Sequence, residues 1–408
     1  MAISAADLLA KAEQGLPFAQ ARAQIVATAP QPRHAPPLLL AKAAGRTLFS
    51  PLVAQRDTPA AAVSAMDGYA LRQADLTALP ACLTIEGQTP AGAAAGQALG
   101  RNCARRIFTG APLPPGADTV VAQENAVPRG DQVIVHDRPT HGAFVRPQAF
   151  DFAAGDPLLP AGQRLDARAL ALAAAANLDR VVTAQPPRVG VLSTGDELRA
   201  PGQVSAAHQV VASNGLTLTA LLNDEGAQGH DLGFVGDDLK ALETALAEGV
   251  AAHDLVITTG GASVGDFDLV QQALANLGGK PVFWRVMMRP GKPVFLWHLG
   301  ETWVLGLPGN PVSAYVCARV LALPWVRSAL GRLAVYEPTE PFTLSADLPK
   351  NGPRHQFARA QVHQGQVVPA PSQDSSLITT LQRAHVLIER PPFDPPKTKG
   401  EQIQAIRL

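Results

Sequence analysis

A regular alternation of apolar strands and helices constrains the fold of this chain most strongly. From Pro187 onward, the β-rich runs RVGVLST, GHDLGFV, DLVITT and TWVLGL are each followed by a helical stretch. Parallel strands need long crossover connections, which are usually helices. The alternation therefore predicts a parallel sheet with helices on its faces.

The rest of the chain has two other textures. Residues 5–28 have helical periodicity, and PPLLLAKAAGRTL predicts a short second helix. After Pro51 come short β-rich segments broken by proline and glycine turns, then a helix in DARALALAAAANLDRVVT, and short strands again at the end. We therefore expect a multidomain α/β plus β protein, divided as follows: an N-terminal helical segment that forms an elongated linker from residues 1–50 and 151–183, an inserted β module at 51–150, a parallel α/β domain at 184–330, and a C-terminal β-barrel-like domain at 331–408.

Charge and cysteine content exclude several classes of function. Lys plus Arg and Asp plus Glu both total 34, so the formal net charge is zero and any anion site must be local. We expect no nucleic-acid partner and no membrane attachment, because the sequence has neither a basic excess nor a run of 18 apolar residues. The three scattered cysteines indicate reduced thiols, and the charged N-terminal stretch is no signal peptide. These features predict a cytoplasmic protein.

Polar residues follow every predicted strand of the α/β region at its carboxyl end. Ligands bind there in open parallel sheets. The residues concerned are Gly195, Asp196 and Glu197; Asp237 and Asp238; Gly260, Gly261, Ser263, Asp266 and Asp268; Pro308, Gly309 and Asn310. Taken singly, each acid is as compatible with capping a helix as with binding a ligand. Their concentration at one edge nevertheless predicts a site, and the glycine loop offers backbone N–H groups to a phosphate.

Two cations and one further acid complete the candidate set. Arg289 and Lys292 lie in the turn MMRPGKPV, just before the last strand of the α/β region. They are either solvated surface charges or part of the same edge. Carboxylates for a metal beside cations for an oxyanion are what phosphoanhydride chemistry requires. Asp67, in SAMDGYA, lies in an apolar part of the β module, where an isolated MDG is most typical of a turn.

Six stretches of the chain resemble the molybdopterin molybdenumtransferases, which insert molybdate into a pterin dithiolene. They are SAMDGYA, VLSTGDEL, SNGLTLTALL, TTGGASVGDFD, RPGKPV and GLPGNPVSA, in family order and at family spacing. The resemblance covers essentially the whole chain. It implies an elongated homodimer of four-subdomain chains, in which the α/β part binds the pterin and forms a cleft with the partner's β module. It also implies adenylylated molybdopterin and molybdate as substrates, Mg²⁺ as cofactor, and release of AMP.

The resemblance also implies residue roles. The catalytic residues would be Asp67, Glu197, Asp268, Arg289 and Lys292. Asp268 with Asp237 or Asp238 would hold the metal. The substrate-binding residues would be Thr194, Gly195, Asp196, Ser213, Asn214, Gly260, Gly261, Ser263, Asp266, Pro308, Gly309, Asn310, Ser313, Asp151, Arg354 and Ser375. A molybdopterin adenylyltransferase and molybdoenzyme-maturation proteins are the partners it suggests.

Two departures and two alternative functions accompany this interpretation. Arg289 stands where the family commonly has lysine, and Ala149 and Phe150 replace glycine and glutamate beside Asp151. One alternative is the adenylyltransferase that makes the adenylylated pterin, but single-domain relatives of that kind lack the β modules and SAMDGYA. The other is a pterin carrier or scaffold without catalysis, against which the full acidic set and the cation turn argue.

Overall fold

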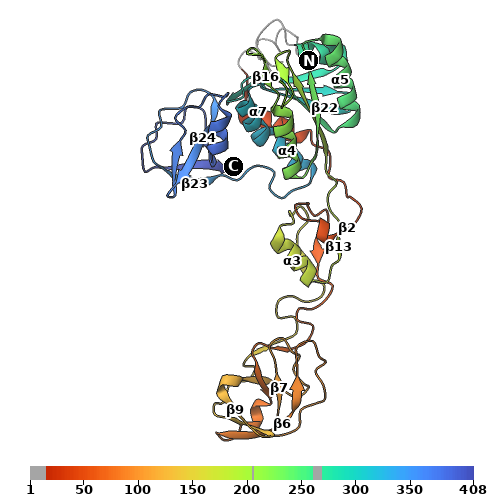
Figure 1. Ribbon diagram of the computed structural model, residues 1–408, viewed down its shortest axis with the longest axis vertical. Helices are drawn as coiled ribbons and strands as arrows, with labels where there is room; N and C mark the ends of the chain where they lie inside the picture. Colours follow the sequence, from red (N-terminus) through yellow and green to blue (C-terminus); the bar gives the residue numbers. More distant parts are fainter. Residues whose placement is uncertain (1–14, 205, 261–268) are drawn as a thin grey trace, which may run out of the picture.

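The protein is elongated, with its parts arranged along one long axis (Figure 1). The structure is a computed structural model and describes residues 15–204, 206–260 and 269–408. The α/β part and a C-terminal barrel lie together at one end, and the β module lies at the other (Figure 1). No helix among the described residues combines the length and the apolar character needed to cross a bilayer.

The α/β part is built on a six-stranded sheet. Its order is β17 (Gln228–Val235), β14 (Arg188–Thr194), β18 (Leu255–Thr259), β22 (Thr302–Leu307), β21 (Phe295–Leu299) and β19 (Lys280–Trp284). The first four strands are parallel, as the alternation predicted. The last two pair antiparallel, which the sequence analysis did not foresee. β21 and β22 are joined by a turn far too short for a parallel crossover.

Helices cover this sheet and carry its apolar core. They are α4 (Asn214–Glu225), α5 (Leu239–Ala252), α6 (Leu269–Asn276), α7 (Pro311–Cys317) and α8 (Leu323–Ala329), with a π-helical turn at Ala318–Ala322 joining the last two. Helix α2 (Phe18–Ala27) packs into the same core through Phe18, Ala21 and Ile25. The sequence analysis predicts residues 1–50 as part of the linker, whereas the apolar face of α2 is buried in the α/β part.

The C-terminal part is a small β-barrel, which confirms the predicted fold class. Strands β24 (His355–His363), β25 (Gln366–Pro369), β23 (Glu340–Leu344), β27 (Gln402–Arg407) and β26 (Val386–Arg390) form a sheet that closes through β24 and β26. Two strands from outside extend the sheet: β20 (Val286–Arg289) pairs with β24, and β1 (Leu16–Pro17) pairs with β20. Helix α9 (Ile378–Arg383) precedes β26. The barrel is therefore hydrogen-bonded to the α/β part through β20.

The β module and the linker account for the remaining length. The module is a six-stranded sheet in the order β8 (Thr119–Ala122), β5 (Gly68–Leu71), β7 (Cys103–Ile107), β6 (Ala81–Thr89), β10 (Gln132–Val135) and β9 (Ala126–Arg129). The linker pairs β2 (Leu38–Leu39) with β13 (Arg180–Val181), β3 (Leu52–Val53) with β12 (Pro157–Leu159) and β4 (Val63–Ser64) with β11 (Val145–Arg146), beside helix α3 (Ala167–Ala175). The helix predicted in PPLLLAKAAGRTL is wrong: that segment forms β2 and a 3₁₀ turn at Leu40–Lys42.

A buried ion-pair network ties the α/β part to the linker. Glu225, the last residue of α4, accepts hydrogen bonds from Arg327 at 2.7 Å and from Arg332. Arg327 also reaches Glu337 at 2.8 Å, and Arg332 donates to the Thr47 hydroxyl of the linker at 3.2 Å. Burial raises the pKa of the Glu225 carboxyl, but the hydrogen bond and the charge of Arg327 outweigh it, so that the pKa is lowered overall.

Replacing Glu225 with glutamine should destabilise the protein strongly. The substitution Glu225→Gln leaves the buried Arg332 guanidinium without its carboxylate partner and Arg327 with Glu337 alone, which costs about 3–5 kcal/mol. Urea unfolding at pH 7 measures the loss. The matched control is Glu340→Gln, which removes an exposed ion pair with Arg407 and should cost less than about 1 kcal/mol. Because the pKa of Glu225 is lowered on folding, the difference from wild type should persist above its ordinary value of 4.5 and vanish as the pH falls through the lowered pKa. Equal losses in both variants would contradict this account of the network.

Candidate active site

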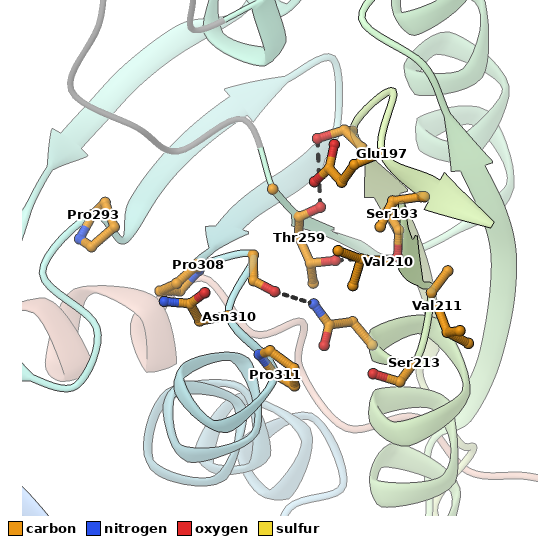
Figure 2. A pocket seen from close by; sticks show the side chains of 16 residues that line it. Ser193, Glu197, Val210, Val211, Ser213, Thr259, Pro293, Pro308, Asn310 and Pro311 are labelled. Carbon is orange, nitrogen blue, oxygen red and sulfur yellow. Dashed lines mark hydrogen bonds between the residues drawn. The ribbon is translucent and has the colours of Figure 1, made fainter. Parts of the chain in front are cut away.

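A pocket of about 440 Å³ opens at the carboxyl ends of the parallel strands. Its lining comes from the ends of β14 and β18, the start of α4, the loop between β22 and α7, and a wall made of β15 (Leu198–Arg199) and β16 (Val210–Val211). Figure 2 shows Val210 and Val211 on the opposite side of the cavity from Pro293 and Pro308. The predicted site residues that line the cavity are Thr194, Glu197, Ser213, Asn214, Gly260, Pro308, Gly309 and Asn310.

Two glycines let the backbone form the floor of the pocket. Gly260 has a φ of +96°, and a Cβ built there would lie 2.3 Å from the carbonyl oxygen of Thr194. A Cβ on Gly309 would lie 3.3 Å from the Cα of Gly260. Three segments therefore meet backbone to backbone, and the contact at Gly260 is one that only glycine permits. Main-chain atoms, rather than side chains, therefore form the pocket surface at these two glycines.

Two asparagine side chains hold the loop between β22 and α7. The side-chain amide of Asn214 donates to the carbonyl oxygen of Gly309 at 2.8 Å, the bond drawn between α4 and this loop (Figure 2). Asn310 donates through its own amide to the Ser375 hydroxyl at 2.9 Å. Asn214 thus joins two walls of the pocket, and Asn310 joins the pocket to the C-terminal barrel. Ser313, predicted to bind substrate, is buried within α7 and does not line the cavity.

Carboxylates gather beside the pocket at the ends of β14 and β17. The backbone N–H of Asp237 donates to Asp196 at 2.9 Å. Burial raises the pKa of the Asp237 carboxyl, and the charges of Asp196 and Glu197 raise it further. Asp238 instead caps α5 by accepting from the N–H of Ala241 at 2.7 Å. Asp237 thus lies near other acids, whereas the carboxylate of Asp238 is already bonded at the start of a helix.

The carboxylates beside the pocket are of the chemical type that binds Mg²⁺. In the described residues no group of three or more His, Cys, Asp or Glu side chains is arranged to hold a metal ion. Mg²⁺ usually binds through one or two carboxylates together with substrate phosphates and water. The mutual repulsion of Asp196, Glu197 and Asp237 is a feature that a divalent cation would relieve. These hard oxygen donors fit Mg²⁺ as a partner completed by substrate.

The turn that carries the two predicted cations adjoins the pocket. Arg289 ends β20 and Lys292 follows in the turn, and both side chains are exposed. Pro293, the next residue, lines the cavity. Gly291, with a φ of +111°, packs against α7 so closely that a Cβ would lie 2.3 Å from the Cys317 sulfur. The turn is thus seated on α7 at the edge of the pocket.

Several predicted site residues lie elsewhere or outside the described chain. Asp67 precedes β5 in the β module, at the opposite end of the molecule from the pocket (Figure 1), and accepts from the backbone and hydroxyl of Thr109 at 2.7 and 2.8 Å. Asp151 is exposed in the linker region, where its N–H donates to Thr58. Arg354 precedes β24 of the barrel. The predicted residues that lie outside the described chain are Gly261, Ser263, Asp266 and Asp268.

The sequence analysis missed the apolar wall of the pocket. Leu198, Val210 and Val211 line it, together with Ser193 and Thr259 at the strand ends. The wall belongs to a two-stranded sheet with only two residues in each strand, so its periodicity is too short to detect. The one available signal was an apolar valine pair one residue before the SNG stretch.

Comparisons with known proteins cover nearly the whole chain. The MoeA N-terminal region (domain I and II) matches residues 16–177, a "Probable molybdopterin binding domain" matches residues 190–328, and the MoeA C-terminal region (domain IV) matches residues 341–408. Among solved structures, the molybdopterin biosynthesis MoeA protein from Pyrococcus horikosii superposes with a TM-score of 0.81 at 26% identity, covering 96% of this chain and 99% of that one.

Curated relatives agree with these matches. The molybdopterin molybdenumtransferase of Nostoc sp. is 38% identical over 78% of this chain and 75% of its own. Molybdopterin molybdenumtransferase 2 of Mycobacterium tuberculosis is 34% identical over 90% of this chain and 93% of its own. This chain therefore belongs to the MoeA family of molybdopterin molybdenumtransferases.

Proposed function

We propose that this protein inserts molybdenum from molybdate into adenylylated molybdopterin, with Mg²⁺-dependent cleavage of the phosphoanhydride and release of AMP. Its role in molybdenum cofactor biosynthesis follows from its relatives, whose shared name is molybdopterin molybdenumtransferase. The observation that supports the finer chemistry is the composition of the pocket edge. Carboxylates meet on one side, and the turn of Arg289 and Lys292 adjoins the other.

Each part of the pocket has a distinct task in this proposal. The backbone floor at Gly260 and Gly309 offers N–H groups to the phosphates of the substrate. Lys292 and Arg289 attract the tetrahedral dianion and the charge that develops on the cleaved phosphate. The apolar wall formed by Val210 and Val211 packs against the flat ring system of the pterin.

The acids beside β14 and β17 are the residues that would hold Mg²⁺. We propose Asp237, with Asp268 from the motif, as its protein ligands, and Asp238 as a helix cap. When bound, Mg²⁺ would neutralise charge on the phosphoanhydride. Glu197 is the acidic side chain that reaches the described cavity lining, where its carboxylate can orient substrate or accept a proton.

A homodimer is part of the same proposal. Asp67 lies in the β module at the far end of its own chain from the pocket (Figure 1). A contribution from Asp67 to catalysis therefore requires the module of a second chain. A cytoplasmic location, and contact with the adenylyltransferase that supplies the substrate and with proteins that mature molybdoenzymes, complete the proposal.

AMP release from purified adenylylated molybdopterin tests the reaction directly. Release should require both Mg²⁺ and molybdate, because the metal assists cleavage and the dianion is the second substrate. Chromatography of the products measures AMP and metal-loaded pterin together. Tight pterin binding without release would show a carrier or scaffold, and consumption of ATP with unmodified pterin would show the adenylyltransferase.

Neighbouring aspartates should respond differently to the same isosteric change. Asp237→Asn should raise the Mg²⁺ concentration for half-maximal AMP release by about tenfold or more, the size expected for one charge-assisted contact. Asp238→Asn is the matched control, because asparagine caps a helix as well as aspartate does. It should leave the Mg²⁺ dependence within about twofold. A larger effect at Asp238 than at Asp237 would reverse the assignment.

Mixed dimers test the shared cleft. Asp67→Ala and Glu197→Gln should each abolish most AMP release as homodimers. A heterodimer of the two variants contains one intact cleft, so it should recover about half of the wild-type activity per dimer. The two chains carry different affinity tags, so that verified heterodimers can be assayed. Activity no higher than in either homodimer would place Asp67 outside the reaction.

A further inference from the structure

A buried arginine in the barrel is bonded to a loop that touches the pocket. Arg359 lies in β24, and only 2% of it is exposed. Its guanidinium donates to the carbonyl oxygen of Asp374 at 2.9 Å and to that of Leu377 at 3.4 Å. Gln373 adds a second clamp, because its side-chain amide accepts from the N–H of Arg359 and donates to its carbonyl oxygen, each at 2.9 Å. Four hydrogen bonds therefore hold residues 373–377 against one strand residue.

The same loop holds the first turn of α7. The Ser375 hydroxyl accepts from the side chain of Asn310 at 2.9 Å, and the Ser375 carbonyl oxygen accepts from the N–H of Val312 at 3.2 Å. The N–H groups in the first turn of a helix have no partner within the helix. Ser375, in the C-terminal part, supplies an acceptor for one of these N–H groups. The hydroxyl and the carbonyl oxygen of Ser375 thus both accept hydrogen bonds from the segment that begins at the mouth of the pocket.

The chemistry of Arg359 suits the fixing of a backbone. Burying a guanidinium is costly unless its donors are satisfied. Arginine presents its donors as a rigid planar fork, so that bonds to two carbonyl groups define the position of the loop between them. Lysine keeps the charge but offers no such fork. Within the loop, Asp374 also accepts from the N–H and the hydroxyl of Ser376, at 2.9 and 2.7 Å.

We infer that Arg359 is a positioning residue for the pocket. It holds the 373–377 loop, through which Ser375 fixes Asn310 and the start of α7. The barrel thereby sets the geometry of a pocket to which it contributes no lining residue among those described. The effect on ligand affinity rests on the proposed function, whereas the coupling from Arg359 to α7 does not.

The effect of Arg359 on the start of α7 is measured first, in the absence of ligand. Amide hydrogen exchange at Val312 should be faster in Arg359→Lys and in Gln373→Ala, because each change loosens the loop that accepts its hydrogen bond. Gln373→Ala leaves the buried charge in place and serves if Arg359→Lys folds poorly. The matched control is Arg390→Lys, which alters another buried barrel arginine, bonded to the Asp394 carboxylate and to the carbonyl groups of Pro349, Asp394 and Pro395. It should lower the unfolding temperature of the protein while leaving exchange at Val312 unchanged.

A double-mutant cycle then distinguishes positioning of the 373–377 loop by Arg359 from a general loss of rigidity in the barrel. Arg359→Lys and Ser375→Ala should each raise the KM for adenylylated molybdopterin about fivefold, the size of one neutral hydrogen bond, with kcat within about twofold. The double variant should match either single one, because both act through Ser375. The inference would be overturned if the two rises in KM multiplied in the double variant. It would also be overturned if Arg390→Lys raised KM by the same factor. Unchanged exchange at Val312 would overturn it as well. Wild-type protein without AMP release would instead reject the proposed function and leave the exchange result standing.

Discussion

The shape of this protein depends on the pairing between two passes of its chain. The chain leaves the α/β part, builds the β module and returns, and the outgoing and returning segments pair as β2 with β13, β3 with β12 and β4 with β11. These strands are short, so their hydrogen bonds alone are weak. A shared apolar core adds to them, with Leu48 and Leu52 from one pass beside Phe152 and Leu165 from the other. Without both, the module would have no defined position relative to the pocket.

Two helices connect the pocket to the buried charges behind it. Helix α4 begins with Asn214 at the cavity and ends with Glu225 in the ion-pair network. The run from α7 through the π-helical turn to α8 begins beside Asn310 and ends near Arg327. The Glu225–Arg327 pair therefore joins the far ends of two helices whose near ends form the pocket. A π-helical turn is costly and is often found in helices that serve functional sites.

Much of the fold was predictable because its signals are local. The strand–helix alternation predicted the four parallel strands, and the polar residues after them predicted the edge where the pocket lies. The failures have a common physical origin. PPLLLAKAAGRTL has the apolar content of a helix, but Leu38 and Leu39 pair with a strand some 140 positions further along the chain. Likewise, β20 joins the barrel, and nothing near it in sequence indicates a partner in β24.

The site shows the same division between local and distant information. Asp238 could be assigned to a cap only once Ala241 was seen to donate to it, since the spacing alone allows both roles. The family resemblance implied Ser375, but its bond to Asn310 joins residues 65 positions apart. Arg359 was not among the residues that the resemblance implied, and its contacts to the loop at residues 373–377 became apparent only in the fold. Sequence spacing identifies candidate site residues, whereas contacts between distant parts of the chain determine which partners each of them binds.

The tight backbone floor also sets the direction in which this pocket can change. A side chain at Gly260 would collide with the carbonyl oxygen of Thr194, and one at Gly309 would press against the backbone of Gly260. A substitution there distorts the sheet edge itself. The opposite wall, Val210 and Val211, lies on a short two-stranded ribbon where both side chains are exposed. Under the proposed function, substitutions in the ribbon would alter contacts with the ring system of the substrate, whereas the glycine floor would stay constant.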